Sequence, residues 1–241
     1  MSDFVSVFAV CCLEWILVCV LPFYIMWRWW PTVFAAFKIQ KKERQAPQLK
    51  IEITYSLLTI PIRALFFWFV VYKSGTLRPA FELTKDVPAF FFYYLIYDPY
   101  FYWTHRLLHW GWLYRNIHVV HHRSVNPTPF ASFSFHPVES ILGLLYMLPF
   151  VYIFNPSLLL FVLLMILTDI GNLAGHTGFE FLPRPTVSSW WGKWITTPTH
   201  HNMHHQFSRY NFGLYWSGWD KYFGTHHPRT EEEFLRVKSG L

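Results

Sequence analysis

The sequence predicts an all-α, multi-pass membrane bundle with a cytosol-facing helical cap that carries boxes of histidines. Three observations predict it. Of the 241 residues 53% are hydrophobic, apolar runs long enough to cross a bilayer recur along the chain, and the histidines gather beyond the third run. A chain of this length suits one domain with a large core, so we expect residues 1–241 to form a single integral membrane domain.

The predicted spans are five apolar runs. No basic segment precedes the first run, so we expect a retained span and not a cleaved signal peptide. Between the last two runs, Asn155 is a favourable N-cap and Pro156 suits a first helical turn, which predicts a tight helical hairpin. The runs are residues 4–26, 51–72, 87–104, 138–154 and 157–173.

A basic loop between the first two runs predicts the topology. Cytoplasmic loops of membrane proteins are rich in lysine and arginine, so this loop is expected in the cytoplasm and the N-terminus outside. The order of the spans then places residues 105–136 and 174–241 on the cytoplasmic side. We interpret the net charge of +6 through this loop, which would face the cytoplasm and contact anionic lipid. We expect no nucleic-acid partner. The loop residues are Lys38, Lys41, Lys42, Arg44 and Lys50.

All 13 histidines follow residue 104, and most fall in boxes with a spacing of three or four residues. Such residues share one helix face, so each box is expected to offer two or three imidazoles to one point. Imidazole binds zinc, copper, iron and nickel, and more than eight convergent rings indicate two ions. The boxes are His105 with His109, His118 with His121 and His122, and His201 with His204 and His205, joined by the single His176.

Two carboxylates precede histidines by seven residues: Asp98 lies before His105, and Asp169 lies before His176. Seven residues are about two helical turns, so each acid is expected on the same face as its histidine. Ionisable groups at membrane depth are costly and usually functional, and metal-bound imidazoles often donate to a carboxylate. We therefore predict that both acids orient ligands. The alternative is a polar pair satisfied between helices.

The ordered boxes resemble the fatty acid hydroxylase / sterol desaturase superfamily from about residue 94 to 228. The tail supports the resemblance with Asn211-Phe-Gly-Leu-Tyr and Trp219-Asp-Lys-Tyr-Phe-Gly-Thr225, and His136-Pro-Val-Glu139 also fits. The resemblance implies a catalytic region at 98–205. Carried over by position, the implied metal ligands are His105, His109, His118, His121, His122, His176, His201, His204 and His205.

The resemblance also implies an activity. Such enzymes hydroxylate or desaturate lipids, such as fatty acyl chains or sterols, with two non-haem irons and O2. The sequence shows no haem domain, so we expect an external electron donor that is cytochrome b5-, ferredoxin- or reductase-like. The host would be a bacterial inner membrane or the endoplasmic reticulum. Glu180 departs from some relatives, which place a histidine there. It is a candidate carboxylate ligand, an acceptor for a ligand, or a plain loop acid.

Two other functions fit a histidine-rich membrane protein: a metal transporter and a non-catalytic scaffold. A transporter should place acids and histidines along a path through the membrane midplane, whereas these histidines gather at one face. Other polar residues have simpler interpretations. His200 is not needed for the H-x-x-H-H spacing, which already begins at His201. His136 precedes the start of a predicted helix. Glu14 and Arg63 are candidates for an ion pair inside the spans.

Overall fold

A computed structural model of the chain describes residues 2–41 and 46–240. Throughout this part the chain is helical, and its β-pairing is confined to isolated bridges. The predicted all-α class is therefore confirmed. Two residues of the basic loop, Lys42 and Arg44, lie outside the described residues. The cytoplasmic position of that loop stays a prediction.

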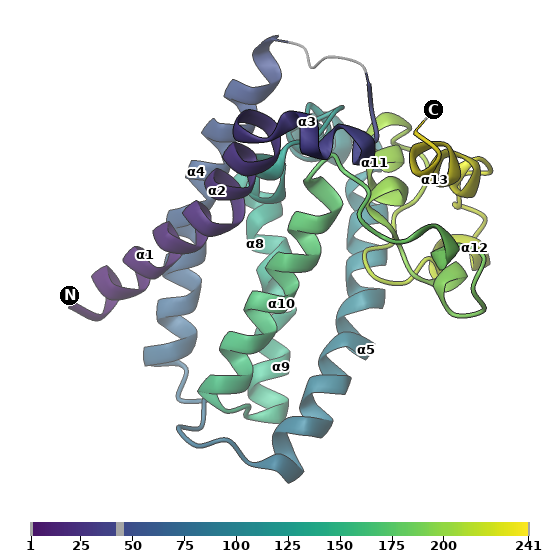
Figure 1. The fold of residues 1–241 in the computed structure, drawn as a ribbon. Coiled ribbons are helices and arrows are strands. Elements are labelled where there is room, and N and C mark those ends of the chain that lie inside the picture. The colour runs from purple at the N-terminus through teal and green to yellow at the C-terminus, as the bar shows by residue number, and fades with distance from the viewer. Residues whose placement is uncertain (1, 42–45, 241) are drawn as a thin grey trace.

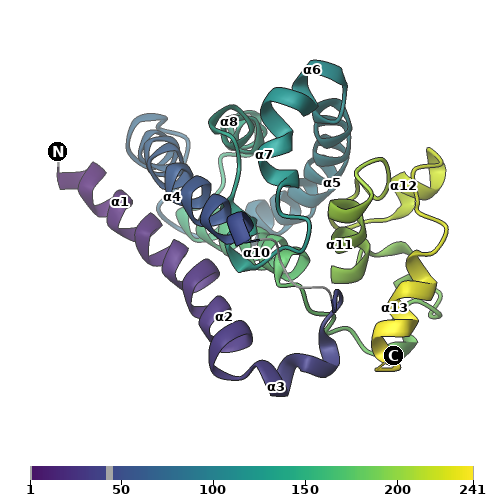
Figure 2. The same cartoon turned by 90° about the horizontal axis from the view of Figure 1, so that it is seen from above.

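The long helices stand side by side as a bundle (Figure 1). The first helix packs at a slant along the outside of the second long helix (Figures 1 and 2). Large buried side chains such as Tyr93, Met147 and Phe161 fill the interior. The bundle consists of α1 (Ser2–Trp15), α4 (Ala46–Trp68), α5 (Leu83–Leu108), α8 (Pro137–Leu145) continued by α9 (Met147–Phe154), and α10 (Leu158–His176).

Four helical stretches of the described chain are long and apolar enough to cross a membrane, and they match four of the five predicted runs. The fifth run, 87–104, lies within α5. At 26 residues, α5 is long enough to span, but its tyrosines, its two prolines and the acids Asp86 and Asp98 make it less apolar than the four stretches. The four stretches are Asp3–Trp29, Pro47–Lys73, Pro137–Phe154 and Leu158–His176.

The hairpin between the last two spans forms, but its cap differs from the prediction. Asn155 ends α9 in the left-handed conformation, with φ at 48°, and so it does not cap the next helix. Ser157 is the N-cap of α10, because its Oγ accepts a hydrogen bond from the Leu160 N–H at 3.1 Å. The physical reason is that asparagine tolerates the left-handed region, and a following proline stops the first helix there.

An ionic triad ties three helices together inside the bundle. The Arg63 guanidinium on α4 lies 2.7 Å from Glu14 on α1 and 2.8 Å from Asp169 on α10. The predicted pairing of Glu14 with Arg63 is therefore confirmed, and Asp169 joins it. Charged groups among apolar helices persist only when they are paired, so the triad fixes how these helices sit against one another.

The residues after α10 fold into a cap over one end of the bundle, beside α5 (Figures 1 and 2). Its central helix is buried from Pro198 to His205, and it begins where Thr197 caps it and Pro198 takes the first helical position. A segment between α5 and α8 reaches the same end. The cap contains α11 (Pro198–Gln206), α12 (Gly218–Tyr222) and α13 (Thr230–Lys238), and the segment contains η5 (Tyr114–His118) and α7 (Val119–His122).

Replacing the arginine of the triad should destabilise the protein. Arg63→Met leaves Glu14 and Asp169 buried without their cation, and we expect a loss of about 3–5 kcal/mol of unfolding free energy. Unfolding in detergent micelles measures it. The triple variant E14Q/R63M/D169N removes every charge and should recover most of the loss. A single variant as stable as wild type would contradict the structural role.

Candidate metal centre

The nine histidines of the predicted ligand set come together at the junction of cap and bundle. They form two groups, and within each group one ligand atom per residue lies within 4.8 Å of all the others. Eight of the nine are buried and His109 is half-buried. The first group is His105, His109, His118, His122 and His204, and the second group is His121, His176, His201 and His205.

Each H-x-x-H-H box is divided between the two groups. Histidines four residues apart stay together, as His118 and His122 do in the first group, while His121 joins the second. In the box 201–205, His201 and His205 belong to the second group, and His204 belongs to the first. A helix turns by about 100° per residue, so position i+4 lies about 40° from i, and i+3 lies about 60° to the other side. Each box therefore offers two imidazoles to one point, as expected, and the third ring of each H-x-x-H-H box goes to the other group.

The second group contains a contact that hydrogen bonding does not explain. The Nδ1 atoms of His121 and His176 lie 3.2 and 2.7 Å from the carbonyl oxygens of Ser134 and Asn172. A carbonyl only accepts, so each Nδ1 carries a hydrogen and each neutral ring has a bare Nε2. Yet these two Nε2 atoms lie 3.2 Å apart. A cation between them would turn repelling lone pairs into ligands.

The first group is also crowded, and its His204 likewise has a bare Nε2. His204 donates from Nδ1 to the carbonyl oxygen of Tyr210 at 2.6 Å, and its Nε2 lies 3.0 Å from that of His122 and 3.2 Å from that of His109. Nitrogen ligands about 2.1 Å from an ion and at right angles to each other are about 3.0 Å apart. Both groups therefore fit a nitrogen-bound transition-metal ion.

Burial keeps these imidazoles neutral. It lowers the pKa of His118, His122 and His204 well below the usual value, and the neighbouring imidazoles lower it further. In the second group the pKa values of His201 and His205 fall for the same reasons. Because the neutral ring is the form that binds a metal, the groups are ready ligands at neutral pH.

A cavity inside the bundle opens onto both groups. Its walls come from α4, α5, α8 and α10, and are largely aromatic and aliphatic, with a polar strip that includes Arg63 and Asp169. A molecule in this cavity would contact ligands of both groups. The histidines that line it are His105, His118, His121, His176 and His201.

Glu139 is a site residue that the sequence interpretation missed. It lies in the first turn of α8, is buried, and places Oε1 2.7 Å from Nδ1 of His118. A carboxylate in this position fixes the ring and raises its basicity as a ligand. The phrase His136-Pro-Val-Glu139 supported the family resemblance, but no role was expected for its acid. The signal was an acid one turn into a helix that follows a histidine box.

Comparison with known proteins identifies the family. The fatty acid hydroxylase family model matches residues 90–225, which cover more than half of the chain and all nine grouped histidines from His105 to His205. The chain belongs to the fatty acid hydroxylase family. Its place in the wider superfamily with the sterol desaturases, inferred from the sequence, is confirmed.

Several relatives of this family member carry sterol-related names. The Delta(7)-sterol 5(6)-desaturase of Leptosphaeria maculans is 30% identical over 200 residues, which cover 78% of this chain and 53% of the relative. Human lathosterol oxidase is 34% identical over 145 residues, covering 60% and 46%. The chain spans about half the length of the curated relatives it matches. No solved structure matches significantly.

The two intramembrane acids contact other partners than the predicted ones. Asp98 accepts hydrogen bonds from the Tyr215 N–H at 3.1 Å and the Trp219 indole at 2.9 Å. His105 instead donates to the carbonyl oxygen of Phe212 at 2.9 Å. Seven helical residues rise by about 10 Å, so an acid two turns away shares the face of the histidine but lies out of hydrogen-bond range.

The same reason applies to Asp169. It pairs with Arg63 and lines the cavity, while the ring of His176 is held by the carbonyl of Asn172 one turn before it. Any influence of either acid on the ligands is therefore indirect. Their catalytic roles stay predictions.

Three further polar residues lie close to the groups without belonging to them. Glu180 is buried and accepts hydrogen bonds from the Thr199 N–H at 2.9 Å and the Thr199 hydroxyl at 2.8 Å. It therefore holds the start of α11. His200 lies 3.3 Å from Asp220, and His136 is the N-cap of α8.

Removing the carboxylate beside His118 should weaken the first group. Glu139→Gln keeps the side-chain size but loses the charge that orients the ring, and we expect metal affinity to fall about 10–100-fold. Elemental analysis after titration with a chelator measures it. The matched control is Glu82→Gln, which removes an acid that pairs with Arg78 at the opposite end of the bundle. This variant should bind metal as wild type does. Equal chelator midpoints for both variants would refute the role.

The metal-free protein should lose stability as the pH falls. Above pH 6.5, neither the folded nor the unfolded state protonates these rings appreciably. Below pH 6.5 the unfolded chain binds protons, whereas the buried rings of the folded protein stay neutral. The unfolding free energy therefore drops by up to about 1.4 kcal/mol per pH unit for each ring. Denaturation midpoints between pH 8 and 5 test this. His204→Asn should show a shallower dependence, and a flat wild-type profile would contradict it.

Proposed function

We propose that the chain is an O2-dependent di-iron membrane oxidoreductase that acts on a C–H bond of a sterol-class lipid. The observation that carries this proposal is the meeting of two imidazole groups at the end of one apolar cavity. A membrane enzyme for a lipid needs a place for an apolar molecule and reactive groups at its end, and this arrangement supplies both.

Iron is the proposed metal of both groups. Imidazole ligands suit several transition metals, so the donor set alone leaves iron among zinc, copper and nickel. The family membership supports iron. Two irons bound by these groups would supply an oxidant made from O2 that is strong enough for an unreactive C–H bond.

The protein has three tasks in this proposal. The carbonyls of Ser134, Asn172, Tyr210 and Phe212 and the carboxylate of Glu139 orient the rings, so that bare nitrogens face the ions. The buried surroundings exclude water, which protects the oxidant from side reactions. The cavity walls hold the lipid so that one of its carbons lies beside both groups.

Hydroxylation and desaturation were both open from the sequence, and the names of the relatives favour desaturation of a sterol. Both reactions consume one O2, two electrons and two protons. Desaturation removes two hydrogens from the lipid and forms two waters, whereas hydroxylation forms an alcohol and one water. The electrons come from the proposed external donor, of a cytochrome b5-, ferredoxin- or reductase-like class. We place the histidine site on the cytoplasmic face, where such a donor would meet it.

A transporter is a weaker candidate. A transport path needs ligands through the membrane midplane. The grouped histidines instead lie together at one end of the bundle, at the C-terminal ends of α5 and α10 and on η5, α7 and α11.

The proposal predicts a change in the lipids of cells that contain the chain. Expression in a sterol-containing host with a reductase system should produce sterols lighter by two hydrogens, or heavier by one oxygen, as detected by mass spectrometry. His121→Ala and His204→Ala should each abolish the product, because each removes a ligand from a different group. Iron-replete protein should carry about two irons. Unchanged lipids together with metal-free protein would end the proposal.

A further inference from the structure

A short backbone segment of the cap supports two ligands of the first group. The Phe212 carbonyl oxygen accepts from His105 Nδ1 at 2.9 Å, and the Tyr210 carbonyl oxygen accepts from His204 Nδ1 at 2.6 Å. Both histidines belong to the first group. The orientation of two of its five rings therefore depends on the conformation of residues 210–213.

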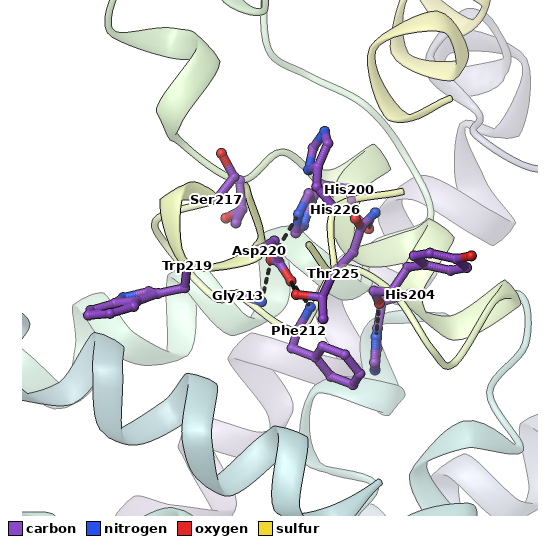
Figure 3. Close-up of polar contacts among 12 residues, drawn as sticks. His200, His204, Phe212, Gly213, Ser217, Trp219, Asp220, Thr225 and His226 are labelled. Atoms are coloured by element: carbon purple, nitrogen blue, oxygen red, sulfur yellow. Dashed lines mark hydrogen bonds and ion pairs between the residues drawn. The ribbon is translucent and has the colours of Figure 1, made fainter. Parts of the chain in front are cut away.

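Asp220 holds this segment in place. Its side chain is fully buried, and it accepts hydrogen bonds from the Phe212 N–H at 2.8 Å and the Gly213 N–H at 2.9 Å (Figure 3). The Thr225 hydroxyl donates to it at 2.7 Å, and His200 Nε2 lies 3.3 Å away. An ionised carboxylate is an acceptor only, and every one of these partners is a donor or can act as one.

The geometry links Asp220 to a ligand through a single peptide unit. The Gly213 N–H and the Phe212 carbonyl belong to the same planar group, so Asp220 and His105 contact its two ends. An anion at the N–H end polarises the peptide and strengthens the hydrogen bond that its carbonyl accepts. A stronger acceptor at Nδ1 makes the imidazole a better metal ligand at Nε2.

Gly213 makes this close approach possible. A Cβ atom at this position would lie 2.9 Å from Asp220 Oδ2 and 2.8 Å from the Trp216 carbonyl oxygen. Both distances are shorter than normal contacts. Any larger residue would therefore push the peptide away from the carboxylate.

The charge state of Asp220 fits this role. Burial raises the pKa of its carboxyl, but the contacts from His200, Thr225 and the Gly213 N–H outweigh burial, and the net pKa is lowered. The carboxylate is therefore ionised at neutral pH. The contact with Asp220 also gives a structural role to His200, the histidine of this box that lies outside both groups.

We propose that Asp220 is a positioning residue for the first metal ion, acting on His105 through the peptide between Phe212 and Gly213. The inference rests on the proposed metal centre. It assigns to the acid of the Trp219-Asp220 motif a task at the metal that differs from general support of the cap. The second group has two of its four rings, His121 and His176, held by the carbonyls of Ser134 and Asn172, and none of its rings donates to a carbonyl of the segment 210–213 in the described residues.

The test compares Asp220→Asn with Asp86→Asn. Asp86 is also fully buried and accepts from backbone N–H groups of Ser157 and Glu82, but it lies at the far end of the bundle. Asparagine keeps the size of the side chain and one accepting oxygen, while its NH2 opposes a peptide N–H. Gly213→Ala is a second variant, which disturbs the same contact and leaves the carboxylate in place.

The measurement is metal per chain during chelator titration of the purified protein, together with the ligand-field spectrum of the cobalt-substituted protein. We expect wild type to hold two ions and D220N to lose one of them at about 10–100-fold lower chelator concentration. G213A should change in the same direction. D86N should lower the denaturation midpoint and keep both ions with an unchanged spectrum.

The outcomes separate this inference from the proposed function. If D220N and G213A release both ions at the wild-type chelator concentration with the wild-type spectrum, Asp220 only supports the fold and the inference is overturned. If D220N does not fold, G213A decides. If wild type itself binds no metal after iron-replete expression, the proposed metal centre fails, whatever the variants show.

Discussion

The structure depends on the crowding of bare imidazole nitrogens at the end of a membrane bundle. In the second group, the Nε2 atoms of His121 and His176 lie 3.2 Å apart although both rings already donate from Nδ1. Without an ion, this contact is repulsive, and burial denies the rings water. Such an arrangement persists only if the rest of the fold imposes it. The triad between α1, α4 and α10 and the buried cap helix α11 are the parts that do so.

The rings are held mainly by backbone carbonyls. His176, in the last turn of α10, donates to Asn172 one turn earlier, at the helix end where carbonyls lack intrahelical partners. The carbonyl groups of Ser134, Tyr210 and Phe212 come from loops that reach the site from other parts of the chain. Glu139 contributes the one carboxylate in the described residues that contacts a grouped histidine. A neutral carbonyl fixes a ring with less desolvation cost than a carboxylate, which suits a buried site.

The two groups are unequal. The first has five imidazoles and the second has four. Glu180 occupies the position where some relatives place another histidine, and it holds the N-terminus of α11 through Thr199 instead of facing the second group. Since α11 supplies ligands to both groups, this acid affects the site through the helix that it anchors. The groups also differ in their support: only the first relies on the segment 210–213.

The sequence by itself determined the helical class, four of the spans and the nine histidines that meet, because apolar length and the spacing of histidines are local properties of the chain. Local spacing also predicted that Asp98 and Asp169 share helix faces with His105 and His176. It did not give their partners, because seven residues along a helix separate an acid from its histidine by more than a hydrogen bond. Only the tertiary structure decided how each box divides between the groups, that Glu139 contacts His118, and that Asp220 holds the peptide beside His105. Those contacts join residues far apart in the chain, and their geometry depends on how whole helices pack.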